Sequence, residues 1–212
     1  MSLTAPDTRP PKRISGEERR LELIQCAIQL FAQKGFRGTT TKEIAQAAGV
    51  NEALIFRHFA TKEDLYAAIL DYKAAQTRTE TLLSELMEHA RKRDDATVFS
   101  EFARKILNHH CSDSCFLHLM LYSALEGHQL ARMFRERQVR PVHDFLRAYI
   151  VERQREGGFR ECNPDAAVRA FIGMVSHHAM AKQLFCDNTV NFSDEEAVSS
   201  FTRIFLQGLR AP

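Results

Sequence analysis

The stretch TTTKEIAQAAGVNEALIFRHF, residues 39–59, contains two short helical patterns separated by a glycine. Thr40 and Glu43 have the spacing of a capping box at the start of the first helix. Asn51 is a candidate N-cap for the second helix, EALIFRHF. About three residues around Gly49 separate the helices, which is the spacing of a helix-turn-helix. We expect Gly49 to supply the positive φ that such a turn requires.

A small apolar core is expected to hold these two helices together. Ala45 and Ala48 are small enough to let them approach closely, and larger side chains fill the remaining space: Ile44, Val50, Leu54 and Ile55. With these side chains facing inward, the polar residues of the second helix face outward. A helix presented in this way fits the DNA major groove, which is about 12 Å wide. The motif therefore predicts DNA binding.

Helical patterns continue on both sides of the motif. Ser15 opens a capping box for a preceding helix, which we expect to end at Gly35. Thr61 and Asp64 cap a following helix, which is predicted to run on towards Met87. Further helices are predicted over residues 95–109, 115–126, 129–156, 164–186 and 194–209.

The predicted fold is all-α, because no alternating pattern of useful length indicates a β-strand. Pro141 lies inside one of the long helical patterns, so we expect a kink or a split there. The expected organisation is a disordered basic arm over residues 1–14, an N-terminal three-helix helix-turn-helix domain over 15–66, and a helical-bundle regulatory and dimerisation domain over 67–212.

The charge of the chain is unevenly distributed. The formal net charge of the 212 residues is only +2, which is too small to indicate nucleic-acid binding. Residues 1–62, however, hold ten Lys and Arg against six Asp and Glu, whereas the remainder holds nineteen against twenty-one. Positive charge thus lies at the end of the chain where a phosphate-binding surface is expected.

The composition argues against a membrane protein. No apolar run approaches the roughly 18 residues that a membrane-spanning helix needs. The polar N-terminus lacks the apolar core of a secretory signal, so a cytoplasmic location without membrane contact is expected. The five cysteines are odd in number and irregularly spaced, which favours reduced thiols.

Residues 109–118, HHCSDSCFLH, combine Cys and His side chains. Cys111, Cys115 and His118 have steps of four and three residues, which on one helical face would suit zinc. A predicted helix break at residues 112–114 disturbs that spacing, and the chain has no paired CxxC motif. The favoured interpretation is that these cysteines are buried and these histidines lie at helix ends, without metal or cofactor. The alternative is metal binding or redox sensing.

Residues 35–66, GFRGTTTKEIAQAAGVNEALIFRHFATKEDLY, resemble the N-terminal signature of the tetracycline-repressor-like (TetR) family. The similarity runs from about Arg19 to Leu70, and the tract in which HF precedes KEDL is its most specific part. The resemblance implies binding to double-stranded DNA, through phosphates and base edges, by Thr40, Thr41, Lys42, Asn51, Glu52, Ala53, Phe56, Arg57, His58 and Lys62.

Two of these positions depart from the family pattern. Phe56 stands where the family usually has tyrosine, so a phosphate hydrogen bond through the hydroxyl is lost. Ala53 replaces a frequent glycine and leaves less room beside the DNA. Arg57 retains a two-donor guanidinium that can read guanine.

The resemblance also implies a homodimer, since two recognition helices must reach half-sites about 34–36 Å apart on a palindromic operator. Heptad-like stripes on the last two predicted helices indicate the interface: Phe171, Met174, His178, Phe185, Val198, Phe201 and Phe205. The alternative is that both stripes face the core of their own subunit.

The middle helices are rich in aromatic residues and methionine, which suits a pocket for an apolar or aromatic effector. The candidate lining residues are Phe102, Phe116, Met120, Phe145, Tyr149, Met174, His177 and His178. The same pattern is also typical of a closed hydrophobic core.

The favoured function is a ligand-responsive regulator, in which effector and DNA oppose each other's binding. An all-helical enzyme has no support, because the chain lacks a Gly-rich phosphate loop, HExxH and a nucleophile elbow. A DNA-binding scaffold that senses nothing predicts a core without a cavity. Repression and activation both fit these patterns, and the family resemblance favours repression.

Overall fold

The computed structural model describes residues 14–77, 79–112, 114–127, 129–184 and 191–211. These residues form eleven α-helices and one π-helix (η1) and contain no strand, as the sequence predicts. The elements are α1 (Gly16–Lys34), α2 (Thr41–Ala47), α3 (Glu52–His58), α4 (Lys62–Thr77), α5 (Thr79–Arg91), α6 (Asp95–Ser112), α7 (Ser114–Leu125), α8 (Gln129–Phe134), η1 (Arg135–Val139), α9 (Arg140–Arg155), α10 (Pro164–Leu184) and α11 (Asp194–Leu209).

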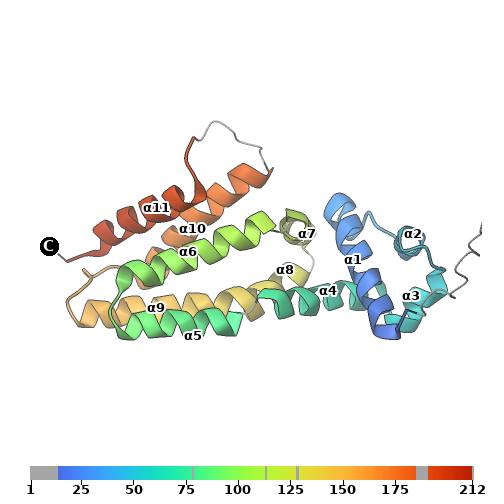
Figure 1. Cartoon of the computed structure of the whole chain (residues 1–212), viewed down its shortest axis with the longest axis horizontal. Coiled ribbons are helices and arrows are strands. Elements are labelled where there is room, and N and C mark those ends of the chain that lie inside the picture. The colour runs from blue at the N-terminus through green and yellow to red at the C-terminus, as the bar shows by residue number, and fades with distance from the viewer. Residues whose placement is uncertain (1–13, 78, 113, 128, 185–190, 212) are drawn as a thin grey trace, which may run out of the picture.

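The molecule is elongated, with α1, α2 and α3 at one end and the bundle of α5, α6, α9, α10 and α11 at the other (Figure 1). Helices α4, α7 and α8 lie between the two ends (Figure 1). No described helix combines the length and the apolar character that crossing a membrane requires. Residues 1–13 of the predicted basic arm lie outside the described residues.

The predicted helix starts are confirmed by their hydrogen bonds. The side chain of Ser15 accepts a hydrogen bond from the Glu18 backbone N–H, and the Glu18 carboxylate accepts one from the Ser15 N–H. Asn51 Oδ1 accepts a hydrogen bond from the Leu54 N–H at 2.9 Å, at the start of α3. Each N-cap satisfies an amide that the first turn of a helix leaves without a partner.

The split expected near Pro141 takes the form of a change of helix type without a break, since Phe134, Val139 and Arg140 keep right-handed helical dihedral angles. The predicted helix over 129–156 is divided into α8, η1 and α9, with Pro141 in the first turn of α9. Proline donates no N–H and its ring crowds the carbonyl one turn earlier, so the regular ladder cannot continue through it. The Arg140 N–H instead donates to the Arg135 carbonyl, five residues back, as in a π-helix.

The predicted fourth helix and the predicted break near 112–114 are described only in part. Helices α4 and α5 cover the expected run towards Met87 on both sides of residue 78, which is itself outside the described residues. Residue 113, between α6 and α7, is also outside them.

Each end of the molecule has its own hydrophobic core. One is built from α1–α4 and includes Phe116 and Leu119 of α7 and Leu130 of α8. The other joins α5, α6, α9, α10 and α11 around Phe99. Because the first core extends through Leu70 and into α7 and α8, packing crosses the domain boundary that the sequence predicts at residues 66 and 67.

Candidate DNA-binding face and effector cavity

The turn between α2 and α3 has the hydrogen bonds of a Schellman motif. Val50 N–H donates to the Ala45 carbonyl at 2.9 Å, and Gly49 N–H donates to the Gln46 carbonyl at 3.1 Å. Gly49 has φ +65°, the left-handed conformation expected of it. This turn sets the position of α3 relative to α2, and therefore the face that α3 presents.

Helix α3 has one buried side and one exposed side. Ile55 is fully buried in the N-terminal core. Ala53, Phe56 and Arg57 are exposed and, at positions i, i+3 and i+4, share one face. Phe56 is 49% exposed and places an aromatic ring on this face. Three of the predicted DNA-binding residues thus lie together.

On α2, Lys42 is exposed, and Gln46, one turn later, shares its face. Gln46 was not among the predicted contacts, although its spacing of four residues from Lys42 was a sufficient signal. Thr40 is exposed and caps α2: its Oγ1 accepts from the Glu43 N–H at 3.2 Å and donates to the Glu43 carboxylate at 2.9 Å. Thr40 therefore has a structural role whether or not it also meets a phosphate.

Thr41 and Glu52 depart from the sequence expectation. Both are half-buried, and the Thr41 hydroxyl donates to the Glu52 carboxylate at 2.5 Å. This bond joins the first turns of α2 and α3, so the two side chains are directed at each other. This contact helps to fix the angle between the helices, and the contact of both side chains with DNA stays a prediction.

Lys62 also has a role that its position in the sequence did not indicate. Its ammonium donates to the carbonyls of Phe36 and Thr39, at 2.7 and 2.8 Å, and lies 4.1 Å from the centre of the Phe36 ring. The expected phosphate ligand is thus already bound to the turn between α1 and α2. His58, another predicted phosphate contact, is half-buried with its ring 6.3 Å from that of Phe59.

The turn between α1 and α2 is held from its other side by α7 and the residue that follows it. The Glu126 carboxylate accepts hydrogen bonds from the N–H groups of Phe36, at 3.1 Å, and Arg37, at 3.4 Å. The Tyr122 hydroxyl donates to the Gln33 carbonyl at 3.4 Å. We call the two Glu126 bonds the Glu126 clamp. Sequence analysis missed it because about 90 residues separate its partners.

The capping box of α2 predicts a pH dependence of stability. The Lys34 ammonium, 2.7 Å away, and the Thr40 backbone N–H lower the pKa of Glu43 from 4.5 to about 2. A lowered folded-state pKa stabilises the fold above about pH 4.5, and this contribution disappears as the pH falls towards 2. We expect Glu43→Gln to lower the thermal midpoint near neutral pH, with the difference from the parent shrinking across this window in circular-dichroism melts.

The control for this experiment is Glu63→Gln, which changes an exposed carboxylate in the first turn of α4. Glu63 makes no salt bridge with a described residue. A difference between Glu43→Gln and the parent that stays constant from neutral pH to pH 2 would contradict the prediction.

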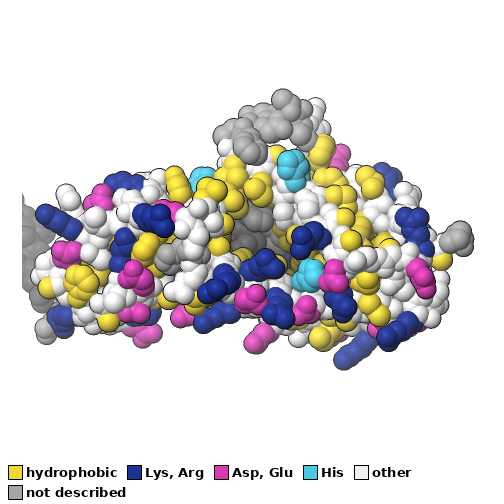
Figure 2. Space-filling view, turned by 180° about the vertical axis from the view of Figure 1, so that it is seen from behind, with side chains coloured by type: hydrophobic (Ala, Val, Ile, Leu, Met, Phe, Trp, Pro, Cys, Tyr) yellow, Lys and Arg dark blue, Asp and Glu magenta, His cyan; other side chains and the backbone are white. Residues whose placement is uncertain are grey.

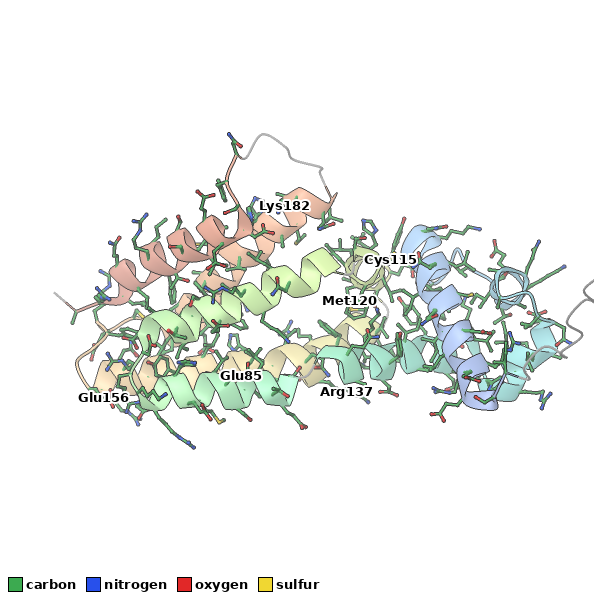
Figure 3. All side chains as sticks on the ribbon, viewed as in Figure 1. Glu85, Cys115, Met120, Arg137, Glu156 and Lys182 are labelled. Atoms are coloured by element: carbon green, nitrogen blue, oxygen red, sulfur yellow. The ribbon has the colours of Figure 1, made fainter. Side chains whose placement is uncertain are left out.

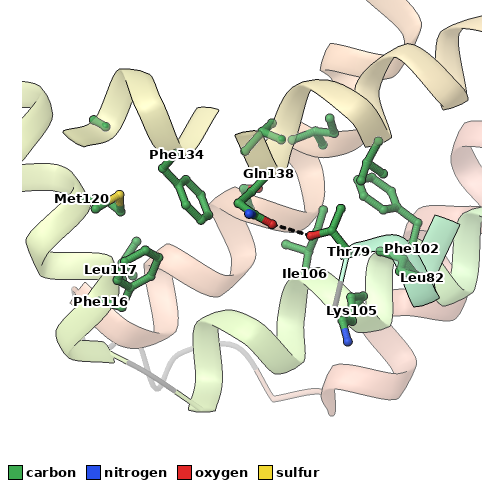
Figure 4. Close-up of a pocket in the computed structure, with 15 residues that line it drawn as sticks. Thr79, Leu82, Phe102, Lys105, Ile106, Phe116, Leu117, Met120, Phe134 and Gln138 are labelled. Carbon is green, nitrogen blue, oxygen red and sulfur yellow. Dashed lines mark hydrogen bonds between the residues drawn. The ribbon is translucent and has the colours of Figure 1, made fainter. Parts of the chain in front are cut away.

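A cavity of about 260 Å³ lies between the middle helices (Figure 4). Three predicted residues line it, Phe102 of α6 and Phe116 and Met120 of α7. Its polar lining groups include Thr79 and Gln138, whose side chains form a 2.5 Å hydrogen bond, and Lys105. The remaining lining residues are Leu82, Ile106, Leu117, Ala131, Phe134, Val139, Val142, Ile172 and Ser176.

Five predicted pocket residues do not line this cavity. Phe145 and Tyr149 pack in the second core, where the Tyr149 hydroxyl donates to Asp95 at 2.5 Å. His177 is exposed on α10. Met174 lines a shallow depression between α10 and α11, and His178 is buried beside Asp194, with 3.2 Å between its Nε2 and the Asp194 carboxylate. Helical period places all five on apolar or adjacent positions, but packing fills the space beside Phe145, Tyr149 and His178, and His177 and Met174 lie away from this cavity.

The predicted dimer residues differ in burial. Phe171, Val198, Phe205 and His178 are buried in their own subunit, which favours the alternative interpretation for these four. Met174 and Phe201 are half-buried, and Phe185 lies outside the described residues. The outward apolar residue of α11 is Ile204, 57% exposed, which the stripe analysis did not select.

The Cys and His cluster is only partly described. The side chains of residues 109–112 lie outside the described residues. Cys115 Sγ donates to Gln29 Oε1 at 3.3 Å, which links α7 to α1. In Figure 3, Cys115 and Met120 lie on α7, at the junction between α1 and the long helices. Among the described side chains, no group of three or more His, Cys, Asp or Glu is arranged to hold a metal ion.

The fold and the exposed face of α3 define a DNA-binding protein of the helix-turn-helix class. Residues 23–69 match the domain described as bacterial regulatory proteins, tetR family. Residues 97–208, more than half of the chain, match the C-terminal domain of AefR-like transcriptional repressors. The chain therefore belongs to the TetR family of transcriptional regulators, and its class is that of regulators rather than enzymes.

Curated relatives match over a limited part of their length. The chain is 52% identical to YvkB of Bacillus subtilis, an HTH-type transcriptional regulator, over 48 residues, which are 23% of this chain and 25% of YvkB. It is 42% identical to the HTH-type transcriptional repressor KstR2 of Rhodococcus jostii over 62 residues, 29% of this chain and 30% of KstR2.

Solved structures match over nearly the whole fold. AibR in complex with isovaleryl coenzyme A and operator DNA has a TM-score of 0.68 and 21% identity, covering 88% of this chain and 97% of AibR. The flavonoid-responsive regulator FrrA has a TM-score of 0.59 and 22% identity, covering 92% and 98%. At these identities the likeness supports the fold.

Proposed function

We propose that this regulator is a homodimeric repressor that binds a palindromic operator and is released by a small effector in its C-terminal helical domain. The observation that carries the proposal is the Glu126 clamp, which connects α7 to the turn leading into α2. Helix α7 lines the cavity through Phe116 and Met120. One helix therefore meets both the candidate effector site and the segment that positions the DNA-binding helices.

The DNA contacts we propose are the exposed residues of α2 and α3. Arg57 and Ala53 would meet base edges, while Lys42 would meet a phosphate, together with Asn51 and Phe56 at the edge of the same surface. Cationic side chains and helix starts are both suited to phosphate oxygens. His58 and Lys62 would contribute by holding the domain together rather than by reaching DNA.

The proposed effector site is the cavity between α5, α6, α7, α8, α9 and α10. Its lining is mostly apolar with a few polar groups, as in many ligand sites. AibR, a similar fold, has been solved with an acyl coenzyme A and operator DNA. The presence of a cavity argues against a DNA-binding scaffold that senses nothing. An effector that displaces α7 would move Glu126 and so change the spacing of the two recognition helices.

The proposed dimer surface is the outward side of α10 and α11. Ile204, Phe201 and Met174 supply exposed or half-buried apolar area there. Gly173 and Gly208 are exposed on the same two helices, and a Cβ added at either would meet no atom within 4 Å. Small residues of this kind allow close approach of a partner helix.

Two substitutions test the DNA-binding face. We expect Lys42→Ala to weaken binding equally for all sequences and to reduce the slope of log affinity against log salt by about one. We expect Arg57→Ala to cost about 1–3 kcal/mol on the operator and to relax specificity. The measurement is fluorescence anisotropy at several salt concentrations, on an operator located by genome-wide footprinting.

The control is Arg91→Ala, which removes an exposed arginine of α5 in the bundle, far from α3 (Figure 1). It should leave affinity and salt slope unchanged. The footprint should contain two half-sites about 34–36 Å apart. Failure of the parent protein to bind any DNA fragment at low salt would refute the proposed function.

A further inference from the structure

The cavity is apolar, and among the described residues that line it the one charged side chain is a cation. Lys105 is half-buried in the wall and makes no salt bridge with a described residue. No Asp or Glu lines the cavity among the described residues. A ligand that carries a negative charge would therefore meet no opposing carboxylate in the wall.

The cavity adjoins a cationic depression on the surface. Val139 and Ile172 line both, so the two spaces share a wall. The depression is otherwise lined by Arg135, Glu136, Arg140, His143, Asp144 and Arg169. Figure 2 shows the back of the molecule, where Lys and Arg side chains, with Asp and Glu side chains among them, lie beside a hollow in the middle of the face.

The arginines of this depression differ in the salt bridges that they form. Arg140 lies 2.8 Å from the Glu136 carboxylate and 3.7 Å from that of Asp144. Arg135 and Arg169 make no salt bridge with a described residue. Arg140 thus pairs with both carboxylates and His143 Nδ1 lies 3.8 Å from that of Asp144, whereas Arg135 and Arg169, at the border of the cavity, have no described carboxylate within salt-bridge distance.

A π-helical turn lies between the two spaces. Helix η1 runs from Arg135 to Val139, so it begins at an arginine of the depression and ends at a residue that the cavity and the depression share. π-Helical turns are rare in proteins, and those that occur are often found at functional sites. Here Pro141 causes the irregular turn, and the irregular turn lies where the apolar and cationic spaces meet.

We propose that the effector is an amphipathic anion. Its apolar chain or ring occupies the cavity, and its carboxylate or phosphate binds Arg135 and Arg169, with Lys105 favouring the same sign of charge. A guanidinium matches the geometry of both anions through paired N–H donors. The cavity exceeds the roughly 150 Å³ apolar space that accepts benzene, so a medium-length chain fits. The inference rests on the proposed effector site and adds its chemical class.

The test uses the full-length protein and four probes that share a ten-carbon chain. Decanoate, decyl phosphate, decanol and decyltrimethylammonium are titrated by calorimetry below their micellar concentrations. We expect the two anions to bind at least about tenfold more tightly than decanol, because an ion pair is added to the same apolar contact. The cationic probe should bind most weakly. Tighter binding of decyl phosphate would identify a phosphate head group, and tighter binding of decanoate a carboxylate.

The variant Arg135→Gln/Arg169→Gln should lower the affinity for the better anion about tenfold and leave decanol unchanged. The matched control, Arg91→Gln/Arg155→Gln, removes the same charge from exposed positions that line neither space. This control should change neither the affinity for the anion nor the affinity for decanol. Retained decanol binding also shows that the double variant is folded.

Three results would overturn the inference: equal binding of decanol and the anions, an equal loss for both classes in the double variant, or no binding of any probe by protein that still binds its operator. Failure of the parent protein to bind any operator DNA would instead refute the proposed function. The two failures are therefore distinguishable.

Discussion

Replacing Phe99 by alanine is expected to lower the free energy of unfolding by about 3–5 kcal/mol. Phe99 is fully buried in the second core. Its ring lies 5.2 Å from that of Phe171 and 4.9 Å from that of Phe205, both edge-on. Truncation removes these contacts and leaves a void that α6, α10 and α11 border together. Because three helices share it, none can close the void alone.

The measurement is urea unfolding followed by circular dichroism, with parent and variant compared at the same protein concentration. Leu125→Ala is the control, since Leu125 is 84% exposed at the end of α7 and its loss should change stability by less than about 0.5 kcal/mol. A loss below about 1 kcal/mol for Phe99→Ala would mean that the bundle repacks, and would contradict the core described here.

The second large effect is expected at Gly35, where a side chain faces two obstacles. Gly35 has φ +72° and ψ 176°, a region that is essentially restricted to glycine and costs other residues about 1–3 kcal/mol. A Cβ there would lie 2.5 Å from Glu126 Oε1. We expect Gly35→Ala to lower stability by at least this amount and to open the Glu126 clamp.

Amide hydrogen exchange measures the clamp directly, because Glu126 accepts from the N–H groups of Phe36 and Arg37. These two amides should exchange faster in Gly35→Ala, and also in Glu126→Ala, where no backbone strain is introduced. Gly127→Ala is the matched control. Gly127 also has a positive φ, +67°, but a Cβ there meets no atom within 4 Å. An equal cost for both glycine substitutions would exclude the steric part of the argument.

The features that sequence analysis predicted well are those in which cause and effect lie within one turn of the chain. The Thr40–Glu43 box needs only four consecutive residues, and the positive φ of Gly49 needs only the absence of a Cβ. The split at Pro141 follows from a missing N–H. Backbone chemistry acts locally in each case, so no knowledge of neighbouring helices was required.

Roles that depend on a distant partner were predicted less well. Lys62 has the charge and the helix-start position of a phosphate ligand, yet its ammonium binds carbonyls that lie 23 and 26 residues earlier. Glu126 had no local signal, because its partners are amides of another helix end. The same side chain can serve either purpose, and packing determines which partner is within reach.

The division between core and cavity has a similar origin. Phe102 and Tyr149 both lie on the inner side of amphipathic helices, and period alone treats them alike. The helical period, the caps and the turn glycine were sufficient to predict an all-α chain with a helix-turn-helix, since each follows from short-range sterics and hydrogen bonding, whereas the role of a regulator was implied by the family resemblance. Long-range packing decides the rest, because a one-dimensional pattern does not encode it. It determines where a cavity is left unfilled, which cations lack a carboxylate partner and how α7 reaches the DNA-binding helices.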